Sequence, residues 1–124
     1  MAVYIHYLNG NDISIQNHYL EKEYRNDIEI EIDGLFYEVY FFTKDALEYE
    51  MTKDGFFSLP GMIILEEITN EKIILAIENL LDTGYFTCFK GYKSLISLEK
   101  FSNRWYSNTP FGFKIENVFS YKIG

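Results

Sequence analysis

Residues 27–42 of this chain read DIEIEIDGLFYEVYFF and carry its strongest structural signal. Isoleucine stands at every second position before Asp33-Gly34, and a second alternating run follows it up to Phe42. Alternation with a period of two is typical of a half-buried β-strand, and Asp-Gly is favoured in the two-residue type I′ turn. The stretch therefore predicts a β-hairpin that turns at Asp33 and Gly34.

A two-residue turn also fixes the register of the hairpin and gives it two different faces. The apolar face pairs Ile28 with Val39, Ile30 with Tyr37, and Ile32 with Leu35. The other face pairs Asp27 with Tyr40, Glu29 with Glu38, and Glu31 with Phe36. Like charges directly opposite each other destabilise a strand pair, so this second face is expected to attract a cationic neighbour. We call its six residues the acidic hairpin face: Asp27, Glu29, Glu31, Phe36, Glu38 and Tyr40.

Weaker signals flank the hairpin on both sides. Residues 2–8 predict a short strand, residues from Ile13 are compatible with a second strand, and residues 17–26 fit a loop or a short helix equally well. After the hairpin, Thr43 can cap a two-turn helix that stops at Asp54-Gly55. The unbroken apolar run within residues 61–68 predicts an inner strand with both faces covered.

The best helix signal covers Asn70–Leu81, with Thr69 as its cap and Gly84 at the position of a left-handed C-terminal cap. Farther along, residues 85–89 predict a strand, residues 94–101 a short helix or a strand, and residues 111–123 one or two closing strands. The fold class that follows is α+β. It is a single domain over residues 1–124, with an antiparallel-rich curved β-sheet packed against one principal helix at residues 70–81.

The acidic residues are concentrated in one part of the sequence. Residues 21–82 contain sixteen Asp or Glu and five Lys or Arg, whereas residues 83–124 contain two acidic and six basic residues. A charge imbalance of this size attracts a cationic partner and repels nucleic acid from the acidic side. We therefore expect a positively charged protein as the partner, and neither direct nucleic-acid binding nor membrane binding.

Recognisable catalytic and cofactor motifs are missing from the sequence. It contains no GxxxxGK[ST] or GxGxxG motif, and neither histidine has a Cys or another His at metal-ligand spacing. The single cysteine, Cys88, lies between aromatic residues and is expected to be a buried, reduced thiol. No targeting or membrane-spanning segment is evident. These features indicate a non-enzymatic cytoplasmic protein without a cofactor or metal.

Three other readings of the composition compete with protein binding. The C-terminal part interleaves basic and aromatic residues, as single-stranded nucleic-acid binders do: Lys90, Tyr92, Lys93, Phe101, Arg104, Trp105 and Tyr106. Paired carboxylates such as Glu66-Glu67, or Glu29 with Glu38, could serve a small hydrolase. An acidic surface can also serve solubility alone. Rings beside the carboxylates on the acidic hairpin face favour a protein interface instead.

Residues 59–69, LPGMIILEEIT, followed by the helix to Leu81 and by Gly84-Tyr85-Phe86, form a pattern of strand, capped helix and aromatic segment. This pattern, about a quarter of the chain, resembles immunity proteins of bacterial contact-dependent growth inhibition and related polymorphic toxin systems. The resemblance implies a protein that binds one cognate toxin, commonly a basic nuclease domain, and covers its active site. Some members of that class do so by accepting a toxin strand onto their own sheet.

The sequence therefore predicts an immunity protein that binds and neutralises a basic toxin domain through a defined set of contact residues. These are the acidic hairpin face, with Asp45 and Glu48 as its rim: Asp27, Glu29, Glu31, Phe36, Glu38, Tyr40, Asp45 and Glu48. Two alternatives remain from other functional classes. One is a phage or plasmid accessory protein that blocks a host defence factor by acidic mimicry, and the other is a small carboxylate-dependent hydrolase.

Overall fold

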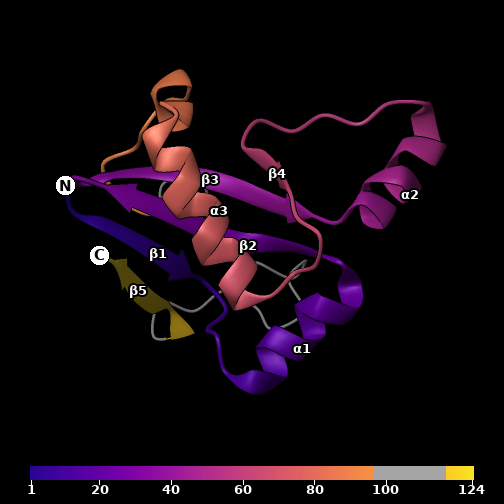
Figure 1. The fold of residues 1–124 in the computed structure, drawn as a ribbon, viewed down its shortest axis with the longest axis horizontal. Helices are drawn as coiled ribbons and strands as arrows, with labels where there is room; N and C mark the ends of the chain where they lie inside the picture. The colour runs from indigo at the N-terminus through magenta and orange to yellow at the C-terminus, as the bar shows by residue number, and fades with distance from the viewer. Residues whose placement is uncertain (97–116) are drawn as a thin grey trace, which may run out of the picture.

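The computed structural model describes residues 1–96 and 117–124, and within them the chain forms an α+β fold built on one open, mixed sheet (Figure 1). Its five strands lie in the order β4-β3-β2-β1-β5. All neighbouring strands are antiparallel except β3 and β4, which are parallel. The bounds are β1 Val3–Tyr7, β2 Tyr24–Ile32, β3 Leu35–Phe42, β4 Met62–Ile64 and β5 Phe119–Ile123. The α+β class is confirmed, but one pair in the sheet is parallel.

The predicted hairpin is formed by β2 and β3 in the expected register. Ile32 lies opposite Leu35, and the pairing of Glu29 with Glu38 is also confirmed. Asp33 and Gly34 have φ values of 48° and 85°, as a type I′ turn requires at both central positions. Beyond Ile28 the register shifts, because β2 contains one extra residue between Arg25 and Ile28. This β-bulge redirects the side chains at that end of the strand.

Three α-helices accompany the sheet in the described part of the chain, where one principal helix was predicted. They are α1 Ile13–Lys22, α2 Lys44–Asp54 and α3 Asn70–Asp82. Figure 1 shows α3 lying across one face of the sheet and α2 beyond the end of β3. Ile73 and Ile77 of α3 are buried, whereas α2 has no buried residue. Helix α3 therefore contributes its own side chains to the buried core, whereas α2 does not.

The predicted starts of α2 and α3 are confirmed by their caps. The side chain of Thr43 accepts a hydrogen bond from the N–H of Ala46, and that of Thr69 accepts one from Lys72. Each bond satisfies a backbone donor that the first helical turn leaves free. Past the end of α3, Gly84 has a φ of 74° and so takes the left-handed conformation expected for it.

The residues from Ile13, which are compatible with a strand in sequence, form helix α1. Residues 17–26, for which a loop or a short helix is predicted, contain the end of α1 and the start of β2. The Asp12 side chain accepts a hydrogen bond from the Ile15 N–H and begins the helix. Ile15 and Tyr19, four residues apart, then turn the same face into the core. Glu23 ends α1 in the left-handed conformation, a position where Gly is the usual signal.

The prediction of an inner strand at residues 61–68 is wrong. The strand is only three residues long, lies at the edge of the sheet, and leaves Ile64 45% exposed. The apolar run misled the prediction because Ile63 and Leu65 do enter the core, while Ile64 between them points outward. Gly61 precedes the strand at a point of close backbone approach to β3.

The segment after α3 also differs from the predicted strand at residues 85–89. Tyr85–Cys88 form a 3₁₀ turn that buries Phe86 and leaves Cys88 exposed, which corrects the expectation of a buried thiol. Of the elements predicted at residues 94–101 and 111–123, the structure describes residues 94–96 and strand β5. Residues 97–116 lie outside the described residues, and with them Phe101, Arg104, Trp105 and Tyr106 of the interleaved basic and aromatic residues.

Candidate functional site

The chain covers part of its own acidic hairpin face. Residues 89–96 pass over this face and pair with β3, since Phe36 donates to the Tyr92 carbonyl at 2.7 Å and Tyr92 donates back at 3.0 Å. Farther on, the Ile96 N–H donates to Glu29 Oε1 at 2.6 Å. Glu29 and Ile96 are each 1% exposed. We call residues 89–96 the strap, and Glu29 lies beneath it rather than on a free surface.

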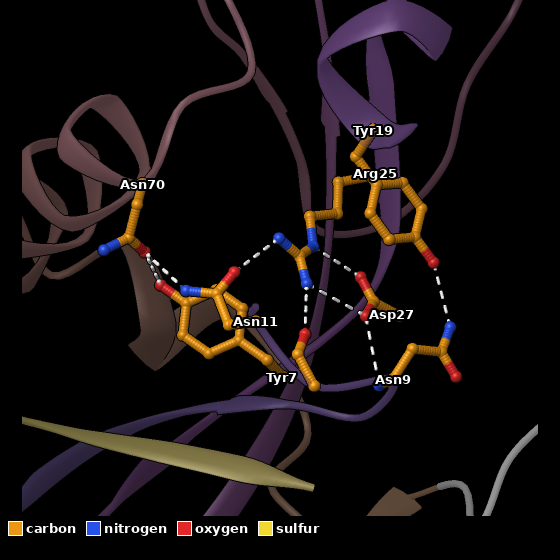
Figure 2. A network of polar contacts seen from close by, with 8 residues as sticks. Tyr7, Asn9, Asn11, Tyr19, Arg25, Asp27 and Asn70 are labelled. Carbon is orange, nitrogen blue, oxygen red and sulfur yellow. Dashed lines mark hydrogen bonds and ion pairs between the residues drawn. The ribbon is translucent and has the colours of Figure 1, made fainter. Parts of the chain in front are cut away.

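Asp27 is not on the acidic hairpin face either, because the β-bulge moves it away from Tyr40 and toward α1. It is buried and accepts from Arg25 through both carboxylate oxygens, at 2.7 Å from Nε and 3.2 Å from Nη2 (Figure 2). The Arg25 guanidinium lies over the rings of Tyr7 and Tyr19, with its central carbon 4.8 Å and 4.5 Å from the two centroids. The expected exposure of Asp27 and Glu29 is therefore wrong.

A polar network joins the buried ion pair to α3 and to the loop before α1 (Figure 2). Arg25 also donates to Asn11 Oδ1 at 2.9 Å and to the Gly10 carbonyl at 2.8 Å. Both the Asn11 amide and the Tyr7 hydroxyl donate to Asn70 Oδ1 at the first turn of α3. A buried charge is stable only with its partners in place, so this network positions the elements relative to one another.

Burial changes the acidity of the two tyrosines in this network. Desolvation raises the pKa of Tyr7 to about 12 and the pKa of Tyr19 to about 12, because the phenolate cannot be solvated there. The Tyr19 hydroxyl accepts from Asn9 Nδ2 at 2.9 Å, which partly opposes the effect of burial. Both rings therefore remain neutral over the physiological range and contribute packing and hydrogen bonds.

A second polar chain crosses three strands through His6. Ser120 Oγ lies 2.7 Å from His6 Nδ1, and Glu31 Oε1 lies 2.9 Å from His6 Nε2. The ring of Phe36 stacks on that imidazole with 5.4 Å between centroids. Sequence reasoning missed the chain because it depends on the pairing of β1 with β5, whose residues are 114 positions apart. Glu31 and Phe36 are half-buried by these contacts.

Serine, histidine and carboxylate in this order are also the components of an activated nucleophile. Nucleophilic catalysis further requires a cleft for the substrate and donors for the developing oxyanion. His6 and Ser120 are directly opposite each other on paired strands, and neither lines any of the hollows described below. The contacts of His6 link β5, β1 and β2.

The predicted rim residues Asp45 and Glu48 are exposed on α2, where further acidic residues accompany them. Two large rings are exposed in the same region: Tyr49 on α2 is 66% exposed, and Phe56 just after it is 71% exposed. Aromatic residues are enriched at protein interfaces relative to the rest of the protein surface. We call α2 and residues 55–59 the α2 arm.

Two hollows lie between the α2 arm, the sheet and the strap, and Tyr40 and Leu59 line both of them. The larger one, about 390 Å³, is also lined by Glu38 and by strap residues such as Tyr92. Burial and a hydrogen bond with Glu38 raise the pKa of Tyr40. The smaller hollow, about 230 Å³, opens between α2 and the sheet. A third hollow of about 140 Å³ lies on the opposite side, near Leu81 and Phe86.

The eight predicted contact residues are thus divided among four environments. Asp27 and Glu29 are buried, and Glu31 with Phe36 belongs to the His6 chain. Glu38 and Tyr40 line the larger hollow, while Asp45 and Glu48 are exposed on the α2 arm. Of the paired carboxylates, Glu66 and Glu67 are exposed in a loop, and Glu29 accepts a strap N–H. Hence the structure does not assemble a single acidic hairpin face.

Comparison of the chain with models of protein families, with curated protein sequences and with solved structures found no match. Within residues 1–96 and 117–124, no three His, Cys, Asp or Glu side chains are grouped so that they could hold a metal ion. The helices of that same part are all too short or too polar to cross a lipid bilayer. Any functional assignment therefore depends on the geometry of the surface.

Proposed function

We propose that this protein is an inhibitor that binds a cationic protein, and specifically an immunity protein for a basic toxin domain. The observation that carries the proposal is the combination of exposed carboxylates and exposed rings on the α2 arm. Rings of this kind bury apolar area in a complex, while carboxylates around them accelerate capture of a basic partner. The binding surface is accordingly the α2 arm rather than the acidic hairpin face.

The charges of α2 support attraction of a cation. Its two lysines lie beside acidic residues of the same helix, with Lys44 Nζ 4.0 Å from Glu48 and Lys53 Nζ 3.1 Å from Glu50. Asp45 and Asp54 are additional carboxylates on this helix. Exposed ion pairs of this type contribute little to stability, so the helix can exchange them for contacts with a partner.

Growth rescue provides the direct test of the function. We expect co-expression of this chain with the toxin domain encoded beside its gene to relieve the growth arrest that the toxin causes alone. The purified proteins should form a complex whose association slows as salt is added, since salt screens the attraction between exposed charges. Toxicity that persists despite normal amounts of folded inhibitor would refute the proposal.

Charge reversal on the α2 arm tests the proposed surface. The double variant Asp45→Lys/Glu48→Lys should associate with the toxin about tenfold more slowly at low salt and show a weaker dependence on ionic strength. Glu71→Lys/Glu78→Lys on α3 is the matched control, since it makes the same change in net charge at exposed helical positions. Equal slowing in both variants would show that net charge, and not the α2 arm, governs binding.

A further inference from the structure

We propose that the smaller hollow, between α2 and the sheet, receives an arginine or lysine side chain of the partner protein. This inference rests on the proposed function and assigns that function an anchor point. The hollow is lined by residues of β2, β3, α2 and the loop after α2: Tyr24, Asn26, Tyr40, Phe42, Glu50, Phe57 and Leu59. Its volume of about 230 Å³ is below the roughly 300 Å³ at which small-molecule pockets usually begin, and it suits one inserted side chain.

The aromatic lining of the hollow is held in place by contacts among its own rings. Tyr24 and Phe42 stack with 6.0 Å between their centroids and an interplanar angle of 28°. Phe57 packs edge-on against Phe42 at 5.4 Å. Phe42 is buried, and the other two rings are half-buried. The lining is thus built from three separate segments whose rings support one another before any partner binds.

The chemistry of the lining favours a cation over a neutral apolar group. The faces of aromatic rings carry negative charge density and attract ammonium and guanidinium groups, most strongly where water is excluded. Glu50 adds a full negative charge to the same lining. A long side chain such as that of arginine could place its methylene groups against the rings and its charged end at Glu50.

Glu50 already shows that it accepts a cation, because Lys53 Nζ lies 3.1 Å from its Oε2. This pair is between residues of the same exposed helical turn, and the Lys53 side chain is more than half exposed. A guanidinium of the partner can therefore replace Lys53 at little cost and can form two parallel hydrogen bonds where the ammonium forms one. The occupant that fits is a basic side chain of the cationic protein.

Small probes test the hollow without the toxin. We expect N-acetyl-arginine amide and N-acetyl-lysine amide, titrated into the ¹⁵N-labelled protein, to shift the amide resonances of residues around the hollow. The neutral N-acetyl-norleucine amide should leave them unchanged. Glu50→Gln should weaken probe binding about threefold to tenfold, and Phe57→Leu should do the same by removing a ring. Glu78→Gln, an exposed change on α3, is the control and should bind the probes normally.

The inference is overturned if the arginine and lysine probes cause no shifts around the hollow, or if norleucine amide causes the same shifts. The toxin complex separates this failure from failure of the proposed function. If Glu50→Gln and Phe57→Leu bind the toxin like the unaltered protein and still rescue growth, the anchor is wrong while the inhibitor function stands. If the unaltered protein binds the arginine and lysine probes but does not rescue growth, the inhibitor function is refuted instead.

Discussion

At the scale of single residues, the largest difference between prediction and structure is Asp27, which is buried in an ion pair with Arg25. Asp27 was expected on an exposed face because strict alternation along β2 places it there. One extra residue in the strand interrupts that alternation. The sequence around Asn26 contains no Gly or Pro from which a bulge could be predicted. The location of a single bulge thus decided whether Asp27 was a surface or a core residue.

Removal of one charge from this pair should be costly. We expect Asp27→Asn to lower the free energy of unfolding by about 3 kcal/mol, because it leaves the Arg25 guanidinium buried without a counter-charge. Urea denaturation measures the change, with the exposed Asp82→Asn as control. If the single variant fails to fold, Arg25→Met/Asp27→Leu should fold, since it removes both charges together. A single variant as stable as the control would refute the structural role of the pair.

The two network tyrosines predict how stability changes at alkaline pH. Their pKa is raised from 10.0 to about 12 in the folded state, so the unfolded chain loses these protons first as the pH rises. Their contribution to the free energy of unfolding is complete below pH 10.0 and is lost as the pH approaches about 12. Absorbance of tyrosinate should show a late titration phase that Tyr7→Phe reduces and the exposed Tyr49→Phe does not. Uniform titration of all tyrosines at their ordinary pKa would contradict the expected burial.

At the scale of elements, predictions succeeded where short-range chemistry defines the structure. The hairpin has its turn in two adjacent residues, and α2 and α3 each begin at a threonine that bonds to its own helix. The edge position of β4 could not be predicted in this way, because it depends on which strand accepts β4 as a neighbour. For the same reason the hollows, which lie between distant segments, were absent from the predictions.

The contact between Gly61 and β3 can be isolated by comparison with a second glycine. Both Gly61 and Gly55 have φ values near +80°, at 81° and 83°, so alanine is strained at either position. A Cβ at Gly61 would lie 2.4 Å from the Glu38 carbonyl oxygen, whereas a Cβ at Gly55 meets nothing within 4 Å. We expect Gly55→Ala to destabilise by about 1 kcal/mol and Gly61→Ala by about 2 kcal/mol or more, measured by thermal unfolding. Equal losses would show that β4 is not packed as closely as described.

At the scale of the whole molecule, the strap determines which part of the acidic sequence remains available. The charge imbalance between the two parts of the chain is visible in the sequence. The path by which residues 89–96 return over β3 is not, because no local signal specifies the pairing of Tyr92 with Phe36. Composition therefore predicted a charged surface, while the topology buries Glu29 beneath the strap and leaves Asp45 and Glu48 exposed on the α2 arm.

Detachment of the strap should expose the hairpin beneath it. Tyr92→Pro removes the N–H that donates to the Phe36 carbonyl, so we expect faster hydrogen exchange at the Phe36 amide, whose own acceptor is the Tyr92 carbonyl. Exchange at Ile96, which donates to Glu29, should also accelerate. Lys93→Ala, at an exposed neighbouring position, should preserve slow exchange. Protected amides in the proline variant would mean that the strap is held by other contacts.

The pairing of β1 with β5 has a consequence for the nascent chain. His6 and Ser120 lie side by side in the sheet but are 114 residues apart in the sequence, so β1 is synthesised long before its outer neighbour exists. During that interval the backbone donors and acceptors along one edge of β1 stay open to other polypeptides. A chain that ends before Phe119 would leave this edge of β1 unpaired and prone to self-association, and completion of β5 pairs it.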